Sequence, residues 1–117
     1  MIHKYIPETD NVFVCDNGRV FRVIEDGCEL DYTVRINNSG YGRVCIKIGN
    51  RFKEKLVHRL VAEAFIKLHP VRKLVNHIDG DKLNNHMSNL EWVTQSQNMK
   101  HYHKLKNKIM LDKHKRL

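Results

Sequence analysis

The sequence has few cysteines, only three among 117 residues, and they stand far apart at Cys15, Cys28 and Cys45. Their number is odd and no two of them form a CxxC pair, so neither a disulfide framework nor a structural zinc site is indicated. Cys15 and Cys45 lie within strand-like segments, where we expect each to be a buried free thiol. Free thiols are typical of an intracellular protein.

Long apolar runs are also missing from the sequence. No stretch approaches the roughly 18 residues of a membrane span, and the first ten residues, MIHKYIPETD, lack the apolar region of a signal peptide. Hydrophobic residues make up 41% of the chain, and the mean hydropathy is −0.55. We therefore expect a cytoplasmic protein without membrane contact, and 117 residues suffice for about one domain.

Charge is unevenly distributed in a chain whose formal net charge is +8. Residues 1–50 are close to neutral, whereas residues 51–73 and 100–117 are each strongly basic. Between these basic flanks, residues 74–99 contain one lysine and three acidic residues. Basic segments suit a polyanion, because its phosphates release counterions when lysine and arginine neutralise them. A solvated surface with a basic tail would have the same composition, so charge alone leaves both interpretations open.

The first half of the chain has the two-residue periodicity of β-strands. Five segments show it: 11–15, 19–24, 33–37, 41–48 and 51–57. The first two are separated by Asp16-Asn17-Gly18, which is a strong hairpin signal. In the fourth segment, Val44, Ile46 and Ile48 share one face. The connections are too short for crossovers, so these strands should pair in an antiparallel sheet.

A periodicity of 3.6 residues replaces this pattern at 58–66 (HRLVAEAFI) and predicts a helix. Its apolar face would consist of Leu60, Val61, Ala64 and Phe65. Its other face would present His58, Arg59, Glu63 and Lys67 to solvent or to a ligand. Pro70 marks the expected end of this helix, because proline cannot continue one.

Beyond this helix the pattern predicts a strand, a loop, a strand and a helix. Residues 73–77 form the first strand, 79–89 an irregular loop and 90–93 the returning strand. Thr94 and Gln97 match a capping box, so a helix should follow and run to about residue 106. The expected fold class is therefore α+β, with a small antiparallel sheet region followed by a ββα unit.

Two segments of this region, VHRLVAEAFI and LVNHIDGDKLNNHMSNLEWVTQSQN, resemble the HNH nuclease family, whose fold is called ββα-metal. The similarity is to its phage and intron-encoded homing branch, and it extends from about Val57 to His101. Residues 11–23, with the segment VFVCDNGRVFRV, are more weakly similar to a sheet-forming module often found ahead of such nucleases. The resemblance divides the chain into an N-terminal β-hairpin module (1–30), a nuclease domain (31–106) and a basic tail (107–117).

The resemblance implies an endonuclease that hydrolyses phosphodiester bonds in double-stranded DNA with a divalent metal ion, Mg²⁺ or alternatively Mn²⁺. His77 would be the general base that activates water, and Asn98 and Asn76 would hold the metal. Asn89 would tie the loop. Several relatives have an anionic or imidazole ligand where Asn76 stands, so metal affinity should be low until a DNA phosphate completes the site. The residue types suit this chemistry independently of the resemblance. An imidazole titrates near neutral pH and can act as a base, and amide oxygens can bind a hard cation.

Basic and imidazole side chains around these segments are candidate DNA contacts, namely His58, Arg59, Arg72, Lys73, His101 and Lys104. His101 follows Asn98 by three residues and so shares its helix face. The remaining side chains would contact the DNA backbone collectively. Two other functions remain open: a DNA-binding module that has lost cleavage, and a small RNA-binding basic protein. The oligomeric state is open as well: a monomer would nick one strand, and a homodimer could cut both. The expected setting is a bacterial or phage-infected cell.

Overall fold

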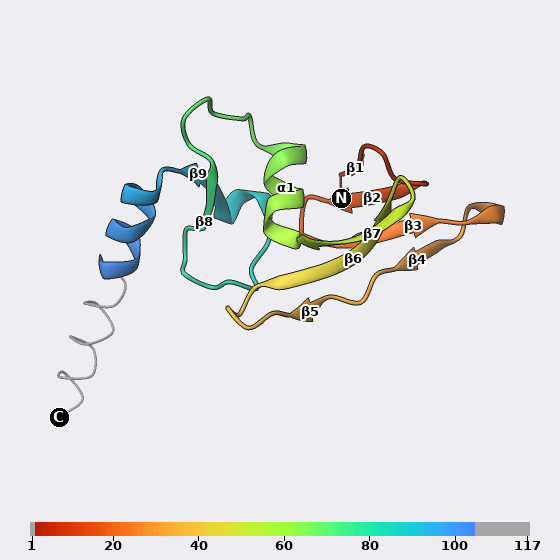
Figure 1. Ribbon diagram of the computed structural model, residues 1–117, viewed down its shortest axis with the longest axis horizontal. Coiled ribbons are helices and arrows are strands. Elements are labelled where there is room, and N and C mark those ends of the chain that lie inside the picture. Colours follow the sequence, from red (N-terminus) through yellow and green to blue (C-terminus); the bar gives the residue numbers. More distant parts are fainter. Residues whose placement is uncertain (1, 105–117) are drawn as a thin grey trace.

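The structure of the protein, a computed structural model, describes residues 2–104. In this part of the chain the strands form three antiparallel sheets, which are arranged along the molecule around a central helix (Figure 1). None of the helices described there is long and apolar enough to cross a membrane.

The first sheet is formed by the N-terminal strands in the order in which they follow one another. They are β1 (His3–Tyr5), β2 (Val12–Cys15), β3 (Val20–Val23) and β4 (Glu29–Asp31), with the short 3-10 turn η1 (Glu25–Gly27) before the last. The hairpin predicted between β2 and β3 is confirmed: Val14 pairs with Val20, and Gly18 has a left-handed φ of 95°. Cys15 is a buried free thiol, as expected.

The second sheet consists of β5 (Arg35–Ile36), β6 (Gly42–Ile48) and β7 (Arg51–Leu56). Val44 and Ile46 are buried on one face of β6, as the alternation predicts. The expectation of a buried Cys45 is wrong, because this thiol is exposed. Since successive strand residues point to opposite faces, Cys45 shares the open face with the exposed Lys47.

The central helix α1 (Val57–Phe65) follows β7 without a loop. It ends before Pro70, because Ile66 already has extended backbone geometry and its N–H closes the last turn on the carbonyl of Ala62. His58 was expected to lie toward solvent or a ligand, and it does not face solvent, because only 6% of the residue is exposed. The first turn of α1 instead directs this imidazole against the rings of Tyr41 and His77.

The third sheet pairs β8 (Leu74–His77) with β9 (Leu90–Val93), and the loop between them contains the 3-10 turn η2 (Met87–Asn89). The predicted capping box follows β9. Thr94 N–H donates to Gln97 Oε1 over 3.0 Å, and Gln97 N–H donates to Thr94 Oγ1 over 3.2 Å. The helix that it starts is described over residues 95–104. Its predicted end near residue 106, and the tail over 107–117, lie outside the described residues.

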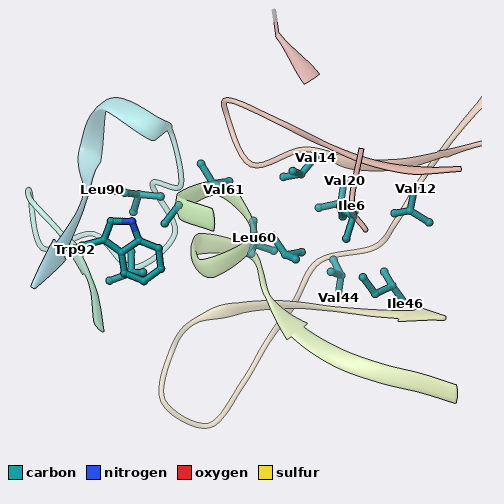
Figure 2. Packing of buried hydrophobic residues seen from close by; sticks show 13 residues of the cluster. Ile6, Val12, Val14, Val20, Val44, Ile46, Leu60, Val61, Leu90 and Trp92 are labelled. Atoms are coloured by element: carbon teal, nitrogen blue, oxygen red, sulfur yellow. The ribbon is translucent and has the colours of Figure 1, made fainter. Parts of the chain in front are cut away.

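One hydrophobic core connects the sheets through α1. Figure 2 shows Leu60 and Val61 of the helix between the valines of the N-terminal sheets and Leu90 and Trp92 of β9. Val12, Val14, Val20, Val44 and Ile46 form the part of the core on the sheet side. The hairpin module and the ββα unit therefore pack on the same helix. Their division near residue 30 stays a prediction.

Candidate active site

A pocket of about 300 Å³ lies where the end of β8, the β5–β6 turn and the helix over 95–104 meet. The residues that line it are Tyr41, Val75, Asn76, His77, Gly80, Lys82, Asn98, Met99, His101 and Tyr102. The capping box turns the chain from β9 into the final helix, so that the first turns of this helix face the end of β8. His77 and Asn98 are thereby brought to one pocket.

His77 is held from several sides. It is the last residue of β8, is 4% exposed and pairs across the sheet with Leu90. Its Nε2 lies 2.8 Å from Oδ1 of the buried Asn85. Its ring also contacts two aromatic neighbours, at centroid distances of 5.8 Å to Tyr41 and 5.0 Å to His58. The imidazole therefore has little rotational freedom.

The second histidine, His58, forms part of the wall behind His77. Its ring stacks on Tyr41 at 4.8 Å. Burial, together with the nearby charges of His77 and Arg59, lowers the pKa of His58 from 6.5 to about 4. His58 is consequently neutral near pH 7 and presents no positive charge to a phosphate.

Asn76 and Asn98 are the oxygen donors of the pocket. Asn76 Nδ2 donates to Glu91 Oε1 over 3.0 Å, which leaves the carbonyl oxygen Oδ1 as the acceptor of that amide. Asn98 comes from the first turn of the final helix, where its N–H donates to the carbonyl of Thr94. Two amide oxygens suit a hard cation that keeps several waters and takes a further ligand from a phosphate. Residues 2–104 contain no group of three or more His, Cys, Asp or Glu side chains that could hold a metal by themselves.

Asn89 lies outside the pocket and ties the loop behind it. Asp79 N–H donates to Asn89 Oδ1, while Asn89 Nδ2 donates to Asp79 Oδ1 and to the carbonyl of Asn84. Hydrogen bonds from Asn84, from the backbone of Asp81 and from Asn89 lower the pKa of Asp79. These bonds fold residues 79–89 onto themselves and fix the loop that leaves His77.

Comparison with known proteins identifies this arrangement. Residues 55–100 match the family model described as HNH endonuclease. The structure entitled "DNA binding and cleavage by the HNH homing endonuclease I-HmuI" superimposes with a TM-score of 0.75 at 35% identity. That alignment covers 86% of this chain and 56% of the other. The part of the chain that forms the pocket is therefore similar to the HNH endonuclease family.

Two relatives show how far the similarity extends. The DNA endonuclease I-HmuI of Bacillus phage SP01 is 38% identical over 86 residues, which are 74% of this chain and 48% of the relative. An uncharacterized HNH endonuclease of Acanthamoeba polyphaga mimivirus is 35% identical over 112 residues, 91% of this chain and 34% of the relative. The chain thus spans less than half the length of either relative. The expected α+β fold class and the resemblance to the homing branch are confirmed.

The HNH pocket contains only one of the residues expected to contact DNA. His101 lines it next to Asn98, and its Nε2 is shielded from solvent without a hydrogen-bond partner among residues 2–104. Arg59 is directed elsewhere: it donates to the carbonyl of Lys73 and lies 5.5 Å from the ring of Trp92. Arg72, Lys73 and Lys104 are exposed outside the pocket.

Three residues of the HNH site were not singled out from the sequence: Tyr41, Lys82 and Asn85. Lys82 Nζ donates to the carbonyl of Ser39 over 2.8 Å and lies 5.0 Å from the centre of the Tyr41 ring. Tyr41 belongs to the turn before β6, far from the motif in sequence, so no local pattern connects it with His77. Asn85 has the polar Asn84 beside it, and the sequence does not show which of the two is buried.

Proposed function

We propose that the protein is a metal-dependent DNA endonuclease that hydrolyses phosphodiester bonds in double-stranded DNA. The observation that carries this proposal is the meeting of His77, Asn76 and Asn98 in one pocket. The DNA cleavage stated for I-HmuI supports the choice of substrate. Phosphodiester hydrolysis needs an activated water and stabilisation of the charge that develops on the phosphate and the leaving oxygen.

His77 acts as the general base. Its imidazole takes a proton from the attacking water, a role that requires a fixed ring with one nitrogen open to the pocket. The contacts of Asn85, Tyr41 and His58 supply the fixed ring. Asn89 assists only through the loop that it ties.

Asn98 Oδ1 and Asn76 Oδ1 would hold a divalent cation, Mg²⁺ or Mn²⁺, with Glu91 keeping the amide of Asn76 in its orientation. When bound, the cation neutralises negative charge on the phosphate and on the leaving oxygen. Both protein ligands are neutral, so the DNA phosphate supplies the first negative charge of the completed site. Metal binding should therefore be weak in free protein and stronger with DNA.

Positive side chains around the pocket would hold the DNA backbone. Lys82 lines the pocket itself, as does His101 of the final helix. Arg72, Lys73 and Lys104 extend the basic surface on the flanking segments. Such contacts orient the duplex without reading its sequence. One pocket of this kind cuts one strand at a time, so we expect a monomer to nick.

Nicking of supercoiled plasmid with Mg²⁺ or Mn²⁺ tests the proposal. The His77→Ala variant should lose about 10²–10⁴-fold in rate, the usual contribution of a general base, while DNA binding is retained. His86→Ala is the matched control, because His86 is an exposed histidine of the same loop outside the pocket. A His77→Ala variant that nicks at the wild-type rate would exclude His77 as the base. Wild-type protein that binds DNA without nicking it would instead be a DNA-binding module.

A further inference from the structure

The two ring nitrogens of His77 have different surroundings. Nε2 lies 2.8 Å from Oδ1 of Asn85, and both residues are buried, with 4% and 8% of their surfaces exposed. The carbonyl oxygen of an amide accepts hydrogen bonds and cannot donate them. In the neutral ring, Nε2 must therefore carry the hydrogen, and Nδ1 must have the lone pair.

The other nitrogen, Nδ1, is open. No group within residues 2–104 forms a hydrogen bond with it, and it is not among the shielded side-chain atoms that lack a partner. Since His77 lines the pocket, the accessible Nδ1 is the nitrogen that water in the pocket can reach.

We propose that Asn85 is a positioning residue that holds His77 in its Nε2–H form, so that Nδ1 is the nitrogen that accepts the proton from water. That Nδ1 accepts this proton during catalysis rests on the proposed function. The tautomer itself is a property of the free protein and can be measured without DNA or metal.

Asn85 is in turn held by the β2–β3 turn of the first sheet. A Cβ atom on Gly18 would lie 2.9 Å from Asn85 Cβ, so only glycine allows this approach. Two residues further along, Met87 N–H donates to the carbonyl of Asp16 over 2.7 Å. The turn thus packs against the loop at Asn85 and bonds to it at Met87. The same proposal therefore gives the N-terminal hairpin a role in the site: its turn keeps Asn85 against His77.

Long-range ¹H–¹⁵N correlation NMR of His77 tests the tautomer directly. Wild-type protein should show the Nε2–H form alone. Asn85→Leu keeps the branched shape of the side chain but removes the acceptor, and it should give a mixture of tautomers and at least about tenfold slower nicking with DNA binding retained. Asn50→Leu, at an exposed position of the β6–β7 turn, should leave the tautomer of His77 unchanged. An Nδ1–H form in the wild type, or an unchanged tautomer in a folded Asn85→Leu variant, would overturn the proposal.

The support from the hairpin turn is tested by a pair of glycine variants. Gly18 and Gly27 have φ values of 95° and 76°, so alanine is strained at both. A Cβ on Gly27 meets nothing within 4 Å, whereas one on Gly18 meets Asn85. Gly18→Ala should therefore change the tautomer of His77 and slow nicking, and Gly27→Ala should do neither. Equal effects of Gly18→Ala and Gly27→Ala would mean that the β2–β3 turn does not support the site.

The two proposals fail in different ways. If the tautomer responds to Asn85→Leu but wild-type protein does not nick, the endonuclease function is wrong and the positioning role of Asn85 stands. If nicking depends on His77 but the tautomer does not depend on Asn85, the positioning role is wrong and the endonuclease function stands.

Discussion

At the scale of single residues, the proposed metal ligands and the histidine behind His77 are neutral groups. The two proposed metal ligands are amides, and the histidine behind the base has a pKa well below neutrality. The carboxylate of Glu91 accepts a hydrogen bond from the amide of Asn76. The proposed metal site would therefore gain its negative charge from the substrate.

Adding a carboxylate to the pocket should make metal binding less dependent on the DNA phosphate. Asn76→Asp alone would place two carboxylates at the present 3.0 Å contact with Glu91 and make them repel each other. The double variant Asn76→Asp with Glu91→Gln avoids this, and we expect it to bind Mn²⁺ without DNA about tenfold more tightly or better, a gain of about 1.4 kcal/mol. Isothermal titration calorimetry would measure the change. Equal affinity in the double variant and in Glu91→Gln alone would argue against Asn76 as a ligand.

His58 makes a contribution to the pH dependence of stability. Its pKa is lowered to about 4 in the folded protein, and the unfolded chain should have the ordinary value of 6.5. Between these values the unfolded state binds more protons, so this contribution to stability is complete above pH 6.5 and is lost as the pH falls toward 4. The loss is of the order of 3 kcal/mol. Chemical denaturation of His58→Leu should lack this part of the pH dependence, and the exposed variant His86→Leu should retain it.

At the scale of elements, the final helix depends on its first turn to present Asn98. Thr94→Ala removes the oxygen that accepts from Gln97 N–H and should weaken the start of the helix by about 1 kcal/mol. Amide exchange at Gln97 and Asn98 should become faster, as followed by NMR. Ser96→Ala, an exposed change in the same turn, is the control. Unchanged exchange in Thr94→Ala would mean that packing rather than the cap starts this helix.

The sequence predicts those elements whose signals are local. The hairpin turn at Gly18, the alternation at Val44 and Ile46, and the capping box at Thr94 all depend on neighbours within a few residues. The burial of His58 could not be predicted in this way. It depends on Tyr41 and His77, which lie on other elements, and helical periodicity places His58 beside Arg59 on the polar face.

The site shows the same limit. His77, Asn98 and His101 follow from the motif and line the pocket together. Tyr41 and Asn85 became visible only through stacking and burial. The end of α1 at Phe65 was also missed, because the chain turns away at Ile66 before proline forces it to do so.

At the scale of the whole molecule, the N-terminal hairpin is part of the shared hydrophobic core. Val12, Val14 and Val20 are 2% exposed or less and pack in the cluster that includes Leu60. Each buried valine is worth about 1.5–3 kcal/mol, so a chain that begins at residue 32 should lose cooperative unfolding. Scanning calorimetry of residues 32–117 would measure this. Removal of 107–117, outside the described core, is the control. A sharp transition in residues 32–117 would mean that the two parts fold separately.

The position of α1 between the two halves of the core also has a kinetic consequence. The valines and Ile46 that pack on its sheet side precede residue 66 in the chain, whereas Leu90 and Trp92 on its other side come later. A chain that emerges from the ribosome N-terminus first can close both N-terminal sheets over α1 before β8 and β9 are made. The pairing of β8 with β9 then completes the core and brings His77 and Asn98 together. We therefore expect the pocket to be the last part of the described chain to assemble, on a scaffold that is already in place.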